Sequence, residues 1–409
     1  MRIKPVYANI TAILALLLLL LLPGCAHQQY ATTPYPAWGE ENSIPQTGDQ
    51  PPLLLRMMYP AGRMKPEACL LLVHGMNEHI GRYRDVAYYF MQRNFMVAGF
   101  DYEAHGLSNL VLWQADQALR TGAEAVDVSE AYLAQAALGN LDPARKSLDL
   151  ALQKTIALCD AHGEADYPVF ILSHSLGALI TATFLLQNRN AITERVQGVV
   201  FLGPGFAVSE PPGWLGWLVN PIIKLSFHAE THFLNPHDEP FPLMAFNQVL
   251  AFLTVPVLEG VFEILSLPGL RRAFSTVTPA WVVDYLTDSA EEKKKIRDDS
   301  WIIRRTVPRY AKGIEEEIVL FRRQMHAFDT PYDLIYSAQD PITPAWGSED
   351  FIHATLNNHS DNCYLELTDS RYHQHLFLTE PRRSEVLQHI TQWLMHRIKV
   401  LNAVQGSGH

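Results

Sequence analysis

Cysteine, positive charge and long apolar runs are all scarce in this chain of 409 residues. Cys69, Cys159 and Cys363 are widely separated and form no Cys-x-x-Cys pair, so they indicate neither a disulfide framework nor a zinc site. We expect buried thiols; a single disulfide in an oxidising compartment is the alternative. The net charge of −11 argues against a nucleic-acid partner, which would need a basic surface to neutralise its phosphates. Hydrophobic residues still make up 48% of the chain, enough for one large core with an insertion.

The N-terminal segment is typical of an export signal. Basic residues precede an apolar run, Ala12–Leu22, which is shorter than the roughly 20 residues of a membrane-spanning helix. The run ends in Leu22-Pro23-Gly24-Cys25, which resembles a bacterial lipobox despite Pro23. We therefore expect residues 1–24 to be a signal peptide and Cys25 to be lipidated in the cell envelope, with the outer membrane favoured by Ala26; an uncleaved signal anchor is the alternative.

Residues 26–52 contain five prolines and almost no aliphatic pattern. Together with Cys25, they form a segment, 25–52, that we expect to be a flexible tether with a reach of roughly 30 Å.

From Leu53 onward, short apolar runs alternate with patterns of helical spacing. The expected strands are Leu70–Val73, Met96–Phe100, Val169–Leu172, Val199–Leu202, Tyr332–Tyr336 and Cys363–Leu367. The expected helices include Tyr83–Arg93, Lys146–His162, Leu179–Gln187 and Glu385–Lys399. Continuous apolar strands separated by helices predict an α/β fold with a mostly parallel, doubly wound sheet.

The stretch 206–328 interrupts this alternation and is rich in Trp, Pro and Leu. We expect a helical cap there, inserted between the two parts of the core, 53–205 and 329–409. Its apolar segments Pro211–Leu218 and Val257–Leu265 fit a lid that lines an acyl-chain channel or touches a membrane. They fit a cap with its own small core equally well.

Ser175 is the candidate nucleophile. The apolar strand Val169–Leu172 runs into Ser173-His174-Ser175-Leu176-Gly177, and a helical pattern follows. A nucleophile elbow needs this strand–turn–helix context, with small residues two positions before and after the nucleophile. Ser173 stands where Gly is more common but is still small.

The other catalytic groups follow from their positions relative to strands. The backbone N–H groups of Met76, after His74-Gly75, and of Leu176 are expected to form the oxyanion hole. Asp340 follows the strand Tyr332–Tyr336 and is the expected orienting acid. For the general base, the segment Tyr372–His375 offers His373 and His375, and the residues alone leave both open.

Three segments together resemble the monoacylglycerol lipase and lysophospholipase branch of the α/β-hydrolases, also called serine aminopeptidase-like. The first segment is His74–Tyr83. The second, Asp101–Ser108, is similar to the family's Asp-x-x-Gly-His-Gly-x-Ser pattern, with Ala104 in place of the first Gly. The third, His375–Glu380, is similar to the pattern His-Glu-Leu-Leu-x-Glu, with Leu376 in place of the first Glu. The resemblance spans roughly Leu53 to Leu394 and implies an α/β-hydrolase fold. Aligning the last segment selects His375 as the base.

His228 and His232 have the i,i+4 spacing of a metal site, but the surrounding sequence is not His-Glu-x-x-His. We expect no cofactor and no functional metal, and structural roles for His74, His105 and His174. The expected function is a serine ester hydrolase for lipids with one acyl chain, attached to a membrane through its lipid. The alternatives are an acyl thioesterase or peptidase with the same triad, and a non-catalytic lipid-binding envelope lipoprotein.

Overall fold

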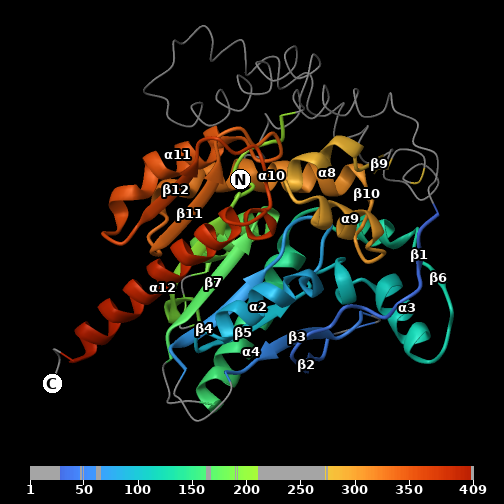
Figure 1. Ribbon diagram of the computed structural model, residues 1–409, viewed down its shortest axis with the longest axis horizontal. Helices are drawn as coiled ribbons and strands as arrows, with labels where there is room; N and C mark the ends of the chain where they lie inside the picture. The colour runs from blue at the N-terminus through green and yellow to red at the C-terminus, as the bar shows by residue number, and fades with distance from the viewer. Residues whose placement is uncertain are drawn as a thin grey trace, which may run out of the picture.

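A computed structural model describes residues 28–46, 48, 50–60, 66–162, 167–188, 190, 192–210, 272 and 275–406. Its centre is an eight-stranded sheet with the strand order β12-β11-β8-β7-β4-β5-β3-β2 (Figure 1). The six strands from β12 to β5 are parallel, and β3 and β2 complete one edge as antiparallel strands. The bounds are β2 Glu40–Ile44, β3 Leu53–Met58, β4 Ala68–Val73, β5 Phe95–Phe100, β7 Val169–His174, β8 Val196–Leu202, β11 Tyr332–Ser337 and β12 Cys363–Leu367.

Helices cover both faces of this sheet, because the central strands are apolar on both sides. In β4, Leu71 and Val73 contact one core cluster, whereas Leu70 and Leu72 contact the other. The first cluster includes residues of α3 (Leu110–Arg120), α4 (Asp142–His162), α5 (Leu176–Gln187), α10 (Pro308–Gln324) and α11 (Ala345–Thr355). The second includes residues of α2 (Arg84–Met91) and α12 (Arg382–Gly406), the red helix in Figure 1. The result is the doubly wound α/β architecture that the sequence predicts, and all six predicted strands are confirmed.

The expectation of a flexible tether over 25–52 is wrong for its described part. Tyr35 and Trp38 are buried, each only 3% exposed. The Tyr35 backbone N–H donates to Asp116 at 2.8 Å, and its hydroxyl donates to Asp101 at 2.7 Å. Strand β1 (Tyr30–Ala31) pairs with β6 (Val126–Asp127), and β2 extends the main sheet. Two large aromatic side chains therefore fix this segment to the α/β core, although its proline content suggests a flexible tether.

The predicted cap is helical in its described part, but its C-terminal limit is wrong. Between β8 and β11 the structure has β9 (Thr276–Val277), α8 (Ala280–Leu286), α9 (Ala290–Asp298), β10 (Arg305–Thr306) and then α10. Tyr310 and Phe321 of α10 are fully buried in the first core cluster, where Phe321 lies 4.3 Å from Phe206, ring centre to ring centre. Helix α10 is thus a helix of the α/β core and not part of a cap.

Several predictions fall outside the described residues: the signal sequence and Cys25, the cap segments 211–218 and 257–265, and the histidine pair at 228 and 232. Among the helices that are described, none is both long enough and apolar enough to cross a membrane.

The expectation that Cys69 and Cys159 are free thiols is also wrong. They form a disulfide that joins β4 to α4, and their Cα atoms lie 6.5 Å apart. Helix α4 packs directly on β4. This packing brings together two cysteines that are 90 residues apart in sequence. Cys363 is a free thiol, as expected, but it is only partly buried.

Candidate active site

Ser175 occupies a sharp turn between β7 and α5. Its backbone has φ 55° and ψ −120°, a region that a residue with a side chain rarely adopts. The turn is held on both sides of the residue: the Ser175 N–H donates to the Leu202 carbonyl at 2.9 Å, and its carbonyl accepts from the Gly205 N–H at 3.0 Å. Strained backbone that its neighbours hold so firmly is the geometry of a nucleophile elbow.

Close packing explains the small residues on either side of Ser175. A Cβ on Gly177 would lie 2.3 Å from the carbonyl oxygen of His74, so α5 approaches β4 only because this residue is glycine. Ser173 is fully buried, and its hydroxyl donates to the Val200 carbonyl at 3.3 Å. The size requirement inferred from the sequence therefore arises from contacts with the two neighbouring strands.

Asp340 pairs with His373. The imidazole Nδ1 of His373 lies 2.7 Å from Asp340 Oδ2, and both side chains are almost completely buried. Burial raises the pKa of the Asp340 carboxyl, but the His373 imidazole, the Ile342 N–H and the Thr343 hydroxyl together bring it below its ordinary value. The ionised carboxylate only accepts hydrogen bonds, so His373 carries its proton on Nδ1 and leaves Nε2 as a base.

His375 does not approach Asp340 in this way, which contradicts the choice of His375 over His373. Its Nε2 lies 3.0 Å from the Ser337 hydroxyl, and burial followed by the nearby His373 lowers its pKa to about 3. Residues 375–377 form a 3₁₀ turn, in which His375 contacts Ser337, the last residue of β11. His373 stands just before this turn, where its backbone N–H donates to the Tyr285 carbonyl at the end of α8, at 2.9 Å.

The His373 ring lies beside the elbow. Its centre is 4.7 Å from that of His174, the residue immediately before Ser175. Gly203 also packs closely against this ring, since a Cβ at Gly203 would lie 3.1 Å from His373 Nδ1. Gly203 directly follows Leu202, whose carbonyl accepts the Ser175 N–H. The structure therefore places the His373–Asp340 pair beside the elbow that carries Ser175, and the three residues follow the parallel strands β12, β11 and β7.

Two backbone N–H groups near Ser175 have no acceptor among the described residues. One belongs to Leu176, the first residue of α5, and the other to Met76, after the β4 strand. The first N–H groups of a helix have no partner within the helix and are suited to stabilise negative charge. These are the two groups that the sequence predicted as the oxyanion hole.

Glu78 is a buried carboxylate that connects the loop after β4, the Ser175 elbow and the loop that carries His373, and no pattern in the sequence singles it out. Its Oε1 accepts from the Gly75 N–H at 2.7 Å, the Tyr83 hydroxyl at 2.8 Å and His174 Nδ1 at 2.9 Å. Its Oε2 accepts from Arg82 at 2.5 Å and from the Gln374 amide at 3.3 Å. Burial raises the pKa of Glu78, but His174 and Arg82 outweigh it and hold the pKa well below its ordinary value.

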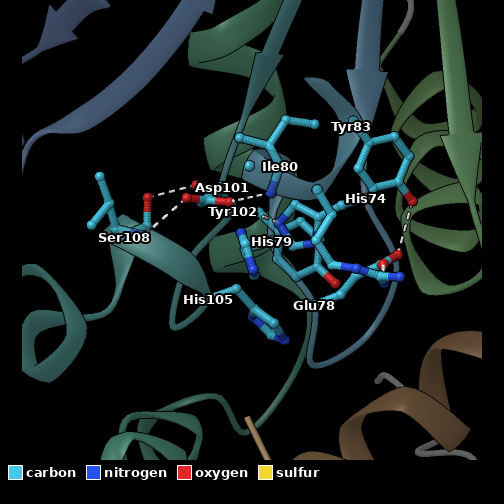
Figure 2. A network of polar contacts seen from close by, with 12 residues as sticks. His74, Glu78, His79, Ile80, Tyr83, Asp101, Tyr102, His105 and Ser108 are labelled. Atoms are coloured by element: carbon cyan, nitrogen blue, oxygen red, sulfur yellow. Dashed lines mark hydrogen bonds and ion pairs between the residues drawn. The ribbon is translucent and has the colours of Figure 1, made fainter. Parts of the chain in front are cut away.

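Asp101 organises the neighbouring loop in a similar way, as Figure 2 shows for its contacts with Ile80 and Ser108. Its Oδ1 accepts from the Ile80 N–H at 2.7 Å, and its Oδ2 accepts from the Leu107 N–H at 2.9 Å. The Ser108 hydroxyl donates to its backbone carbonyl at 2.5 Å. These contacts join the segment after β5 to Ile80, which follows the loop that carries Met76.

The three other histidines near the site have structural contacts, as expected. Nδ1 of His74 lies 2.8 Å from the Gly75 carbonyl, Nδ1 of His105 lies 3.0 Å from the Glu103 carbonyl, and His174 binds Glu78. Burial lowers the pKa of all three imidazoles, so they are neutral near pH 7.

Comparison with known proteins identifies the relatives of this fold. The sequence profile of the family described as "Serine aminopeptidase, S33" matches residues 64–381. An uncharacterized abhydrolase domain-containing protein of Dictyostelium discoideum is 23% identical over 353 residues, which are 86% of this chain but only 29% of that protein.

Among solved structures, a soluble variant of monoglyceride lipase from Saccharomyces cerevisiae in complex with a substrate analogue has a TM-score of 0.60 at 14% identity, covering 89% of this chain and 98% of the lipase. Monoacylglycerol lipase of Paleococcus ferrophilus has a TM-score of 0.53 at 17% identity, with 84% and 99% coverage. A carboxyl esterase of Bacillus coagulans in complex with glycerol has a TM-score of 0.53 at 16% identity, with 88% and 98% coverage. At these identities the likeness establishes an α/β-hydrolase fold.

Proposed function

Because the chain belongs to the serine aminopeptidase, S33, family of α/β-hydrolases, we propose that it is a serine carboxylic-ester hydrolase for lipids with one acyl chain. The observation that carries this proposal is the juxtaposition of a strained Ser175 elbow with a buried His373–Asp340 pair. A retired hydrolase fold with only a binding role would have no need to maintain the strained turn and a buried ionised carboxylate.

In the proposed mechanism, the Ser175 hydroxyl attacks the ester carbonyl carbon while His373 Nε2 accepts its proton. The Asp340 carboxylate stabilises the resulting imidazolium through the Nδ1 hydrogen bond. The N–H groups of Met76 and Leu176 donate to the oxyanion of the tetrahedral intermediate. The imidazolium then protonates the leaving alcohol, and water, activated by the same imidazole, releases the fatty acid from Ser175.

A single-chain lipid is the substrate class favoured by two observations. The segment between β8 and α8 is rich in Trp, Leu and Pro, which suits contact with an acyl chain. Two of the solved relatives are monoacylglycerol lipases by name, one of them from a complex with a substrate analogue. The first feature also suits a lysophospholipid, whose ester has the same acyl part and a different head group.

We further propose a membrane position for the enzyme, through a lipid on Cys25. The Cys69–Cys159 disulfide supports export, because such bonds persist in oxidising compartments. Gln29 is fixed to the fold, because its backbone N–H donates to the Ser129 hydroxyl at 2.7 Å. Only three residues separate Gln29 from Cys25. At roughly 3.5 Å per residue, the anchor would hold this part of the enzyme within about 15 Å of the membrane. Palmitate labelling that persists in a Cys25→Ser variant would contradict the anchor, whereas Cys363→Ser should label normally.

The functional test compares Ser175→Ala with wild type on a panel of monoacylglycerol, lysophospholipid, acyl-CoA and aminoacyl-arylamide substrates. We expect wild type to prefer the two lipid esters and Ser175→Ala to lose at least about 10⁴-fold in kcat. Ser173→Ala is the matched control, since it removes a buried hydroxyl of the same strand and should change kcat little. A preference for acyl-CoA or arylamide would replace the substrate class with a thioesterase or peptidase, and an unchanged Ser175→Ala would reject the mechanism.

A further inference from the structure

A second cluster of reactive side chains lies at the opposite end of β11 from Asp340. Asp333 is the second residue of this strand, and Cys363 stands directly beside it on the parallel strand β12. His389 reaches both from helix α12, which covers this face of the sheet. Sγ of Cys363 lies 3.3 Å from Asp333 Oδ1, and Nε2 of His389 lies 3.0 Å from the same oxygen.

The spacing of these atoms is close to that of a metal site. One ligand atom from each residue can be chosen so that all three lie within 4.8 Å of one another. In a tetrahedral zinc site, bonds of about 2.0–2.3 Å place ligand atoms roughly 3.3–3.8 Å apart. The contacts of 3.3 and 3.0 Å would thus lengthen by only a few tenths of an ångström to admit an ion.

The unsatisfied oxygen of the buried Asp333 carboxylate also points to a missing ligand at this site. Its side chain is fully buried, yet within the described ranges no Lys or Arg pairs with it, and its Oδ2 has no hydrogen-bond partner. Its partners are a thiol, which is a weak donor, and the His389 imidazole, which pairs with Oδ1 as an ion pair when protonated and leaves Oδ2 unsatisfied. A buried carboxylate with one oxygen unsatisfied is costly, and it needs an explanation that the rest of the fold does not provide.

We propose that Asp333, Cys363 and His389 bind one Zn²⁺ ion. Thiolate, imidazole and carboxylate are the ligands that zinc takes in proteins, and this combination disfavours Mg²⁺ and Ca²⁺, which prefer oxygen alone. The Cys363 thiol loses its proton to solvent on binding, so a thiolate and a carboxylate balance the two charges of the ion. The side chain of His389 is 30% exposed, which leaves a path from solvent and room for a water as fourth ligand.

The ion would connect the last two strands of the sheet to the C-terminal helix. Its role is structural, because the cluster lies at the far end of β11 from the catalytic groups. Binding to the folded state alone raises the stability of the fold, and the rise grows with the free zinc concentration.

The test uses full-length protein without a polyhistidine tag, freed of metal by a chelator and titrated with Co²⁺ and then Zn²⁺. We expect one Co²⁺ per chain, with the near-ultraviolet band of a thiolate–cobalt bond, which Zn²⁺ abolishes by displacement. Cys363→Ser should lack the band, and His389→Ala should weaken binding at least tenfold. His396→Ala is the matched control, since His396 lies two turns further along α12, is largely exposed and faces Asp361 at 3.8 Å.

Folding of each variant is checked by circular dichroism and by hydrolysis of a short-chain p-nitrophenyl ester, which should match wild type. A rise in Tm with Zn²⁺ in wild type and His396→Ala, but not in His389→Ala, would support the site. The proposal is overturned by a cobalt complex without the thiolate band, by a band that persists in Cys363→Ser, or by equal losses in His389→Ala and His396→Ala.

Discussion

Replacing Glu78 with Gln should weaken both the fold and catalysis, because five donors converge on this one carboxylate. The amide keeps a single accepting oxygen and turns an NH₂ group toward donors. Arg82, whose side chain is only 7% exposed, then loses its anionic partner. Removing one partner of a buried ion pair typically destabilises a protein by about 3–5 kcal/mol.

The size of the change in Tm follows from the unfolding entropy. At about 2.1 cal/mol/K per residue, a chain of 409 residues loses roughly 4–6 °C for this change in free energy. Catalysis should suffer separately, because Glu78 binds Gly75 of the oxyanion loop, His174 of the elbow and Gln374 of the base loop. Displacement of these loops by about 1 Å is expected to lower kcat about 10²-fold, with a smaller effect on KM.

Thermal unfolding by circular dichroism, at one scan rate, and kinetics on a p-nitrophenyl ester measure the two effects. Glu291→Gln is the control, since its side chain is 76% exposed and its loss should leave Tm and kcat unchanged. A Glu78→Gln enzyme with a Tm within 1 °C of wild type and kcat within about twofold would refute the role of Glu78 as a positioning residue.

Three further predictions concern other parts of the fold. Burial lowers the pKa of His375 to about 3, so between pH 6.5 and pH 3 only the unfolded chain takes up a proton at this residue. The free energy of unfolding should therefore fall by up to about 1.4 kcal/mol per pH unit as the pH is lowered through this range. Urea titrations at pH 7 and pH 5 should show a smaller fall for His375→Gln than for wild type. Gly177→Ala places a Cβ 2.3 Å from the His74 carbonyl and should cost about 1–3 kcal/mol and most of the activity; wild-type kinetics would contradict this packing argument. Replacing Cys69 and Cys159 together by Ala removes a crosslink across 90 residues and should lower the free energy of unfolding, measured by urea titration, by about 2–5 kcal/mol. Non-reducing mass spectrometry that finds both thiols free in wild type would exclude the bond.

The sequence predicts the parts of the fold that local patterns determine. The central strands are continuous apolar runs, and the elbow is a strand that meets a helix at small residues, so both are visible without tertiary information. The prolines of segment 28–46 predict a flexible tether, but the segment is packed on the core. Tyr35 and Trp38 hold it there through contacts with residues far along the chain, which local sequence does not show. The Cys69–Cys159 bond was missed for the same reason, since only the packing of α4 on β4 brings the two residues together.

The choice between the two histidines failed because it relied on spacing. Aligning Glu380 with the last residue of the family pattern places the base five residues earlier, at His375. In the structure His373 binds Asp340, so the loop is two residues longer than the pattern assumes. Gln374, between the two histidines, contacts Glu78 and Arg82, and spacing along the sequence does not show this tertiary contact.

Labelling of Ser175 by a fluorophosphonate probe tests the central claim, that Ser175 is activated by His373 and Asp340. Wild type should label on the peptide that contains Ser175, and Ser175→Ala should not. His373→Ala should lose labelling, whereas His375→Ala, once its fold is verified by circular dichroism, should keep it. Labelling that survives in His373→Ala but disappears in a folded His375→Ala would contradict this account.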